Sequence, residues 1–206
     1  MNRLTSILLL LALLQAPAAL AKRQIYNNPV IKRDFPDPTV IRHTDGYYYA
    51  YSTGNLVPVY RSPNLVAWTS VGNAFTSATR PQFVEGAGIW APDINKIGDK
   101  YVMYYSMSTW GGEWACGIGV AVADSPYTTF KDAKKLFISS EIGVQNSIDP
   151  FYMEDEDGTK YLFWGSFRGI YGIELTDDGL SLKPGAEKFQ IAGTLTEGTY
   201  IHKRGG

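Results

Sequence analysis

The sequence predicts an all-β fold built from repeated four-stranded units, the architecture of a β-propeller. Three observations indicate this fold. Strand-forming aromatic residues are interrupted by turn-forming glycines, no segment shows sustained helical periodicity, and one pattern of strands and turns recurs three times. The chain of 206 residues contains 14 tyrosines, five tryptophans and 21 glycines. Because aromatic residues favour strands and glycine favours turns, this composition is typical of short strands joined by tight turns.

The first 21 residues are predicted to be a secretory signal peptide and not part of the fold. Arg3 supplies a positive charge, residues 7–14 form an apolar core, and Ala19-Leu20-Ala21 is a small-residue end suited to cleavage. The apolar run is too short to span a bilayer, and no later run approaches that length. We therefore expect cleavage after Ala21, a mature domain of residues 22–206, and secretion of a soluble protein to the periplasm or the medium.

Charge and cysteine content exclude several classes of protein. The formal net charge is −1, without a run of like charges, so neither a nucleic acid nor a membrane surface is an expected partner. Cys116 is the one cysteine of the chain, so an internal disulfide is excluded. The many tyrosines and tryptophans suit carbohydrate, whose apolar ring faces stack on aromatic side chains, although most of them belong to the core. We expect a monomer.

The repeat begins in each unit with an aspartate next to or near a proline. The three leading segments are Asp37-Pro38-Thr39-Val40-Ile41, Ala91-Pro92-Asp93-Ile94-Asn95 and Asp149-Pro150-Phe151-Tyr152. Their aspartates, Asp37, Asp93 and Asp149, are 56 residues apart each time (93 − 37 and 149 − 93). A glycine turn and an aromatic strand follow, then a third strand, a turn and a last strand, as a propeller blade requires. The last strands are expected near Trp68, Phe130 and Leu182.

The position of these aspartates predicts a functional site. The first strand of each propeller blade lines the central channel, so Asp37, Asp93 and Asp149 should meet at one end of it. Each of them alone also suits a turn, the commonest use of aspartate. Asp37 lies between two prolines, which restrict its backbone. Several carboxylates brought together must be stabilised or used, because like charges repel.

Taken in order, these motifs resemble glycoside hydrolase family 43. The residues that carry the resemblance are Asp37-Pro38 with Gly46-Tyr47-Tyr48, then Trp90-Ala91-Pro92-Asp93, Ser147-Ile148-Asp149-Pro150 and Glu197-Gly198. Members of that family are five-bladed β-propellers that cleave arabinose- and xylose-containing polysaccharides with inversion of configuration. Residues 165–175, following residues 144–150, look most like the endo-acting arabinanases. The resemblance therefore implies hydrolysis of α-1,5-arabinofuranosidic bonds in arabinan, a plant cell-wall polysaccharide.

The resemblance also implies three catalytic carboxyl groups. Asp37 matches the general base that activates water, and Glu197 matches the general acid that protonates the departing oxygen. Asp149 matches the second aspartate, which orients the acid and raises its pKa. Inverting hydrolysis needs one protonated and one ionised carboxyl group, about 6.5–9.5 Å apart so that a water fits beside the sugar. Asp93 has no catalytic role in the family, and we expect it to be structural.

A further set of residues matches positions that contact substrate in arabinanases. They are Trp90, Gly111, Asn146, Ser147, Ile148, Ser166, Phe167 and Arg168. Arg168 departs from the family pattern, which commonly has an aromatic residue there, and Trp90 is either a stacking wall or buried beside its blade. The chemistry requires no cofactor. Family members often hold a structural calcium ion in the channel with a histidine from a later blade, a position that His43 and His202 do not match.

The repeat spacing indicates how much of the propeller this chain contains. Blade three is expected to close near Gln190 and blade four to begin within residues 197–206, so about three of five blades and the start of a fourth are present. By the same spacing, about a hundred further residues would complete the fold, so we expect a C-terminally truncated fragment.

Other functions remain open at this point. The same fold and mechanism suit a β-xylosidase or an α-L-arabinofuranosidase, and exo action is not distinguished from endo action. A non-catalytic carbohydrate-binding propeller and a purely structural propeller belong to other classes. Neither needs an acid, a base and a modulator, so the presence of all three carboxyl groups argues against both.

Overall fold

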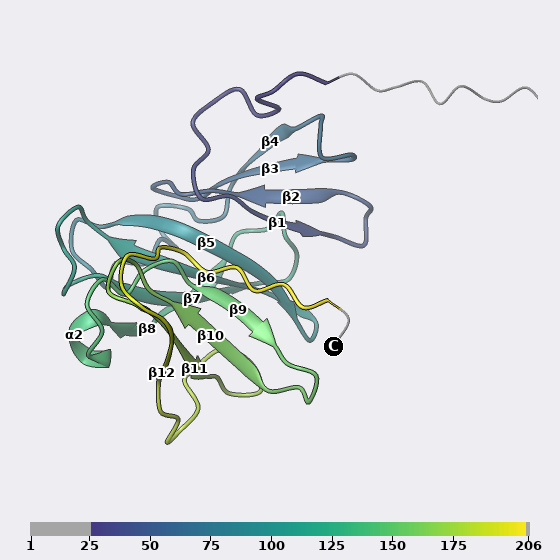
Figure 1. Cartoon of the computed structure of the whole chain (residues 1–206). Helices are drawn as coiled ribbons and strands as arrows, with labels where there is room; N and C mark the ends of the chain where they lie inside the picture. Colours follow the sequence, from purple (N-terminus) through teal and green to yellow (C-terminus); the bar gives the residue numbers. More distant parts are fainter. Residues whose placement is uncertain (1–25, 205–206) are drawn as a thin grey trace, which may run out of the picture.

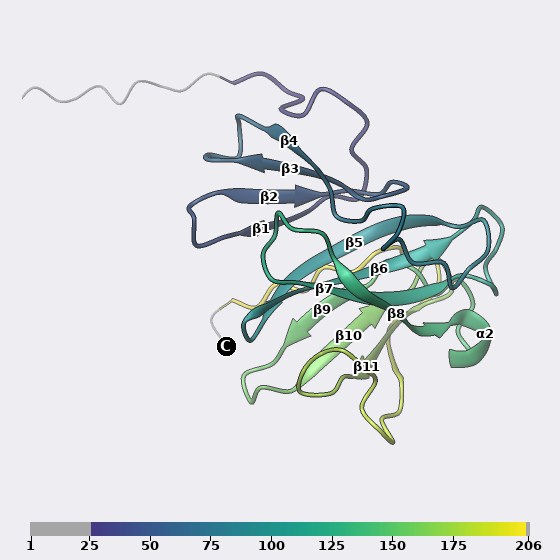
Figure 2. The ribbon, with the colours of Figure 1, turned by 180° about the vertical axis from the view of Figure 1, so that it is seen from behind.

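The computed structural model describes residues 26–204, so the predicted signal peptide lies outside the described residues. These residues form three four-stranded sheets, and the strands of each sheet follow one another in sequence order (Figure 1). Both views place the sheets in layers, with the second sheet between the first and the third (Figures 1 and 2). Antiparallel meanders of four strands are the blades of a propeller, so the predicted all-β class and three blades are confirmed.

The strands have the following bounds. The first sheet comprises β1 (Thr39–Arg42), β2 (Tyr48–Tyr51), β3 (Pro58–Ser62) and β4 (Thr69–Asn73). The second comprises β5 (Gly88–Ile97), β6 (Lys100–Ser108), β7 (Gly117–Ala123) and β8 (Lys131–Ile138), followed by the one-turn helix α2 (Ser139–Ile142). The third comprises β9 (Phe151–Glu154), β10 (Lys160–Trp164), β11 (Ile170–Glu174) and β12 (Phe189–Ala192). Within residues 26–204, no helix is long and apolar enough to cross a membrane.

The hairpin turns of the first and third sheets have the same construction. The carboxylates of Asp45 and Asp157 each accept a backbone N–H from two residues further on, at 2.9 Å. Gly46 and Gly158 follow them with φ of 88° and 86°, a conformation that glycine adopts without steric cost. The aspartate–glycine turns predicted to open the second strand of these blades are therefore confirmed.

Strand β6 packs on two cores at once. Tyr101, Met103 and Tyr105 belong to the buried cluster between the first and second sheets. Val102 and Tyr104 belong to the cluster between the second and third sheets. Because successive side chains of a strand point to opposite faces, a strand buried on both faces reads as an unbroken apolar and aromatic run. The middle blade is therefore held by its neighbours on both sides.

The structure corrects the register of the repeat. Asp37 and Asp149 each precede a proline just ahead of the first strand of their sheet, and both have positive φ, 49° and 60°. The residue of the second sheet with the same two features is Ala91, which precedes Pro92 at a bulge in β5 and has φ 41°. The prediction that Asp93 is equivalent to the other two aspartates is therefore wrong. The true steps are 54 and 58 residues (91 − 37 and 149 − 91), because the equivalent position in the middle blade is the residue before Pro92 and not Asp93.

Asp93 instead joins the inner strands of the second and third sheets. Its Oδ2 accepts a hydrogen bond from the backbone N–H of Tyr152 at 2.7 Å and another from Asn95 Nδ2 at 2.8 Å. Burial raises the pKa of Asp93 to about 6, and the two hydrogen bonds oppose that rise. These contacts between β5 and β9 agree with the structural role expected for Asp93.

The last strands lie as predicted in two of the three blades. β4 begins directly after Trp68 and β8 directly after Phe130. In the third blade the prediction of a last strand near Leu182 is wrong, because Leu182 forms only an isolated bridge with Leu175. The chain folds back on itself there before it rejoins the sheet as β12, which contains Gln190. Closure of blade three near Gln190 is confirmed.

Residues 193–204 return along the inner edge of the third sheet (Figure 1). Glu197 forms an isolated bridge with Ser166, and the ring of Tyr200 lies 5.3 Å from that of Phe151 in β9. Apart from that bridge, residues 193–204 form no strand. The segment expected to begin a fourth blade therefore lies beside β9 without forming a strand of its own, and it carries Glu197 to the cavity.

Two neighbouring tyrosines of β6 give a matched test of how the sheets are joined. The buried hydroxyl of Tyr104 donates to the carbonyl of Gly179, in the turn between β11 and β12 of the third blade, at 2.6 Å. The buried hydroxyl of Tyr105 has no hydrogen-bond partner within residues 26–204. Tyr104→Phe should lower the free energy of unfolding by about 1–2 kcal/mol, because a buried carbonyl loses its partner. Tyr105→Phe should leave the stability unchanged or raise it. Urea unfolding measures both, and equal losses would contradict this account of the interface.

Candidate active site

The three predicted catalytic residues lie together in one cavity of about 1340 Å³. Asp37 comes just before β1, Asp149 just before β9, and Glu197 lies in the segment that returns along β9. Six of the eight residues predicted to contact substrate also line this cavity: Trp90, Gly111, Asn146, Ile148, Ser166 and Phe167. The propeller arrangement thus gathers residues more than a hundred positions apart in the chain at one end of the inner strands.

The carboxylate of Asp37 is held in place from two blades. Thr53, at the end of β2, donates its hydroxyl to Asp37 Oδ2 at 2.5 Å and accepts the N–H of Ala91 at 2.8 Å. The N–H of Thr53 also donates to the carbonyl of Pro36 at 3.1 Å. Asp37 itself is exposed to the cavity. A fixed carboxylate in contact with solvent is suited to accept a proton from water.

The charges of both other carboxyl groups act on Asp149. Its backbone N–H donates to Ser106 Oγ in β6 at 2.9 Å, and its side chain is half-buried. Burial, followed by the negative charges of Glu197 and then Asp37, raises the pKa of Asp149 to about 7. Like charges disfavour ionisation only at short range, so the charges of Glu197 and Asp37 both reach Asp149 in this cavity.

Glu197 is oriented by the loop between β10 and β11. The hydroxyl of Ser166 donates to Glu197 Oε1 at 3.1 Å, and the same two residues form a backbone bridge. Ser166 is itself buried, and its carbonyl accepts a hydrogen bond from Asn146 Nδ2 at 3.1 Å. The Glu197 side chain is exposed and faces the cavity. A carboxyl group fixed by one donor and open on the other side is suited to give a proton to a bound substrate.

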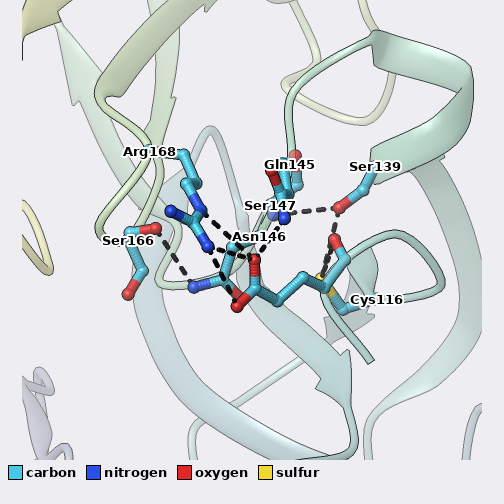
Figure 3. Close-up of polar contacts among 8 residues, drawn as sticks. Cys116, Ser139, Gln145, Asn146, Ser147, Ser166 and Arg168 are labelled. Atoms are coloured by element: carbon cyan, nitrogen blue, oxygen red, sulfur yellow. Dashed lines mark hydrogen bonds and ion pairs between the residues drawn. The ribbon is translucent and has the colours of Figure 1, made fainter. Parts of the chain in front are cut away.

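Two of the predicted substrate contacts do not line the cavity. Ser147 is fully buried, and its hydroxyl accepts a hydrogen bond from Trp164 Nε1 at 3.1 Å. Its backbone N–H donates to Ser139 Oγ at 3.0 Å (Figure 3). Its geometry therefore argues against a contact with substrate and assigns it to the packing behind Asp149. Arg168 forms an ion pair with Glu113, with Nη2 3.1 Å from Oε2, so its guanidinium is engaged beside the cavity and not within it.

Sequence reasoning missed three residues of the site. Trp110 lines the cavity, is 94% exposed, and lies with its ring 5.3 Å from that of Trp90. Trp90 was predicted to be either a wall of the cavity or buried beside its blade, and its place in the lining beside Trp110 supports the first. Trp110 directly precedes Gly111, so its place in the sequence was a usable signal. Thr53 and Glu113 gave no such signal, because their contacts join segments 16 and 55 residues apart.

The described residues do not by themselves provide the calcium site that the resemblance implies. Within residues 26–204, no group of three or more His, Cys, Asp or Glu side chains is arranged to hold a metal ion. His43 lies instead among three tyrosine rings, those of Tyr49, Tyr101 and Tyr127. His202 is exposed in the C-terminal segment.

The raised pKa of Asp149 predicts a measurable cost in stability. The native state holds the Asp149 proton more tightly than the unfolded chain does, so the free energy of unfolding should fall as pH rises from about 4 to about 7. Asp149→Asn stays neutral, so the variant should show a flatter profile and be more stable than wild type at pH 8 by about 2 kcal/mol. Thermal and urea unfolding across pH 4–8 test this, and profiles that run parallel would contradict it.

Comparisons with known proteins agree with this site. A family model described as "Glycosyl hydrolases family 43" matches residues 26–206. The chain is 31% identical over 175 residues to a probable arabinan endo-1,5-alpha-L-arabinosidase A of Aspergillus flavus, covering 82% of this chain and 54% of the relative. It is 36% identical over 155 residues to an arabinan endo-1,5-alpha-L-arabinosidase C of Emericella nidulans, covering 73% and 48%. The chain thus spans about half the length of the curated relatives it matches.

Solved structures of arabinanases also resemble this chain. An alpha-L-arabinanase of Cellvibrio cellulosa complexed with arabinohexaose is 28% identical, with a TM-score of 0.69 over 78% of this chain and 54% of that one. An exo-1,5-alpha-L-arabinanase from a bovine ruminal metagenomic library is 30% identical, with a TM-score of 0.63 over 80% and 57%. The fold is that of a five-bladed β-propeller, of which three blades are described. The chain belongs to glycosyl hydrolase family 43.

Proposed function

We propose that this chain carries the catalytic centre of an inverting hydrolase of α-1,5-linked arabinan. The observation that carries the proposal is the meeting of Asp37, Asp149 and Glu197 in one cavity, with Asp149 under the influence of both other charges. A binding module or a structural propeller needs no such arrangement, because bringing carboxyl groups together is costly. The names of the relatives, arabinan endo-1,5-alpha-L-arabinosidases among them, support arabinan as the substrate and endo action.

The proposed mechanism gives each carboxyl group one task. Asp37 takes a proton from a water molecule, which attacks the anomeric carbon on the face opposite the leaving group. Glu197 donates a proton to the glycosidic oxygen as the bond breaks. Asp149 and Glu197 act as a pair: because like charges disfavour the ionisation of both carboxyl groups, the pair retains one proton, and Glu197 delivers it. Because a single displacement occurs, the product has the inverted configuration.

The aromatic wall of the cavity suits a sugar chain. Trp90 and Trp110 offer exposed ring faces next to the carboxyl groups, and such faces cover apolar area of a ligand at low cost in side-chain entropy. Together with the predicted leader at residues 1–21, this supports an exported enzyme that meets polysaccharide outside the cytoplasm. We propose that it acts as a monomer.

The direct experiment is hydrolysis of debranched arabinan by the protein, followed by proton NMR of the first products. Hydrolysis with inverted anomers, and little release from xylan or aryl β-xyloside, supports the proposal. Products with retained configuration would show that Asp37 is not a base acting through water. Binding of arabinan without hydrolysis would favour the carbohydrate-binding alternative.

The roles of base and acid separate when the leaving group is changed. Asp37→Asn removes the group that activates water, so it should lower kcat by at least about 10²-fold on every substrate. Glu197→Gln should damage arabinan hydrolysis as severely but largely spare an aryl arabinofuranoside with an acidic phenol, since that leaving group needs no proton. Steady-state kinetics on both substrates provide the measurement. Equal losses for Glu197→Gln on the two substrates would remove Glu197 from the role of acid.

A further inference from the structure

We propose that Arg168 and Glu113 form a clamp between the second and third blades that positions the acid, Glu197, through the loop of residues 165–169. This inference rests on the proposed function, since it concerns the group expected to donate the proton. It assigns Arg168 a positioning role in place of the direct substrate contact expected from the sequence.

The clamp itself is a forked ion pair supported by a third residue. Arg168 donates from Nε to Glu113 Oε2 at 3.2 Å and from Nη2 to both carboxylate oxygens, at 3.1 and 3.5 Å. Gln145 Nε2 donates to the same Oε2 at 2.5 Å. The planar guanidinium fixes direction as well as distance when it binds a carboxylate with two nitrogens. Arg168 is therefore held in one orientation although its side chain is 49% exposed.

Backbone contacts extend the clamp to Ser166. The N–H of Asn146 donates to the carbonyl of Glu113 at 2.8 Å, and Asn146 Nδ2 donates to the carbonyl of Ser166 at 3.1 Å (Figure 3). The N–H of Arg168 donates to that same carbonyl at 2.8 Å. Phe167, between the two, has φ 56°, a strained conformation for a residue with a side chain. A tight turn of this kind persists only where its surroundings fix it, and Glu113 and Asn146 provide that support.

The far side of the loop holds the acid. Ser166 Oγ donates to Glu197 Oε1 at 3.1 Å, and the N–H of Phe167 donates to the carbonyl of Thr196 at 2.7 Å. The 165–169 loop thus lies between the Glu113 clamp on one side and the Glu197 segment on the other. A shift of this loop changes the position of the donor on Glu197, and a misplacement of about 1 Å is enough to reduce catalysis strongly.

The clamp has a consequence that a substrate contact does not. The Ser166 hydrogen bond fixes the direction in which the Glu197 carboxyl group faces the cavity. Arg168→Gln should loosen the loop and weaken that bond. It should also lower kcat by about tenfold, because the acid is less well oriented, while KM changes less than about twofold.

The activity test uses four variants of the protein and one control. Ser166→Ala should give the same loss of kcat as Arg168→Gln, and the double variant should add nothing to either, because both changes act on one hydrogen bond. Arg168→Lys keeps the charge without the fork and should recover part of kcat. Lys183→Gln breaks a comparably exposed ion pair with Glu174 in the same blade and should leave kcat, KM and the pH profile unchanged.

A second measurement does not depend on activity. Amide hydrogen exchange in the peptide of residues 165–171 should accelerate in Arg168→Gln and in Glu113→Gln, and remain at the wild-type rate in Lys183→Gln. If the protein proves inactive on arabinan, faster exchange still supports the clamp while the proposed function fails. Unchanged exchange in Arg168→Gln overturns the clamp whatever the activity. A large rise in KM with kcat unchanged also overturns it, since that result assigns Arg168 to direct binding of substrate.

Discussion

The site depends on placing Asp149 half-buried beside two other carboxyl groups. Burial and like charge both oppose ionisation there, and together they raise the pKa of Asp149 to about 7. Contacts with the surrounding blades offset this unfavourable free energy. Behind Asp149 lie the hydroxyl of Ser106, the buried Ser147 and the core of the second and third sheets. A cavity that concentrates negative charge is therefore supported from behind by a buried core, as preorganised sites require.

The same backbone device sets two of the carboxyl groups. Asp37 and Asp149 each take a left-handed conformation immediately before a proline, and proline fixes the backbone that follows. The side chain then leaves the inner strand at its start and points across the channel mouth. Ala91 adopts this conformation in the middle blade without a carboxyl group. The blade geometry supplies three such positions, and the chain places an acid at two of them.

Much of the fold and part of the site could be predicted from the sequence. The pattern of strands and turns depends on residues close together in the sequence, so the aspartate–glycine turns, the aromatic strands and the proline positions predicted the three blades. The equivalent position in the middle blade carries alanine and not a carboxyl group, so the search for a repeated aspartate and its even 56-residue spacing selected Asp93 in place of Ala91. The fold-back around Leu182 was also missed. The segment there looks like a strand, but Leu182 forms only an isolated bridge with Leu175, and β12 is the strand that pairs with β11. Burial of Ser147, the Thr53 link and the Arg168–Glu113 pair are tertiary contacts, which no local pattern encodes.

The central claim is that Asp37, Asp149 and Glu197 act on one another in a single cavity. The most direct measurement is a carbon-13 NMR titration of the aspartate side-chain carboxyl groups, with the Asp149 signal assigned by its loss in Asp149→Asn. The account predicts a midpoint for Asp149 near pH 7 that falls when Glu197→Gln or Asp37→Asn removes a neighbouring charge. A midpoint near pH 4 that neither substitution changes would contradict it.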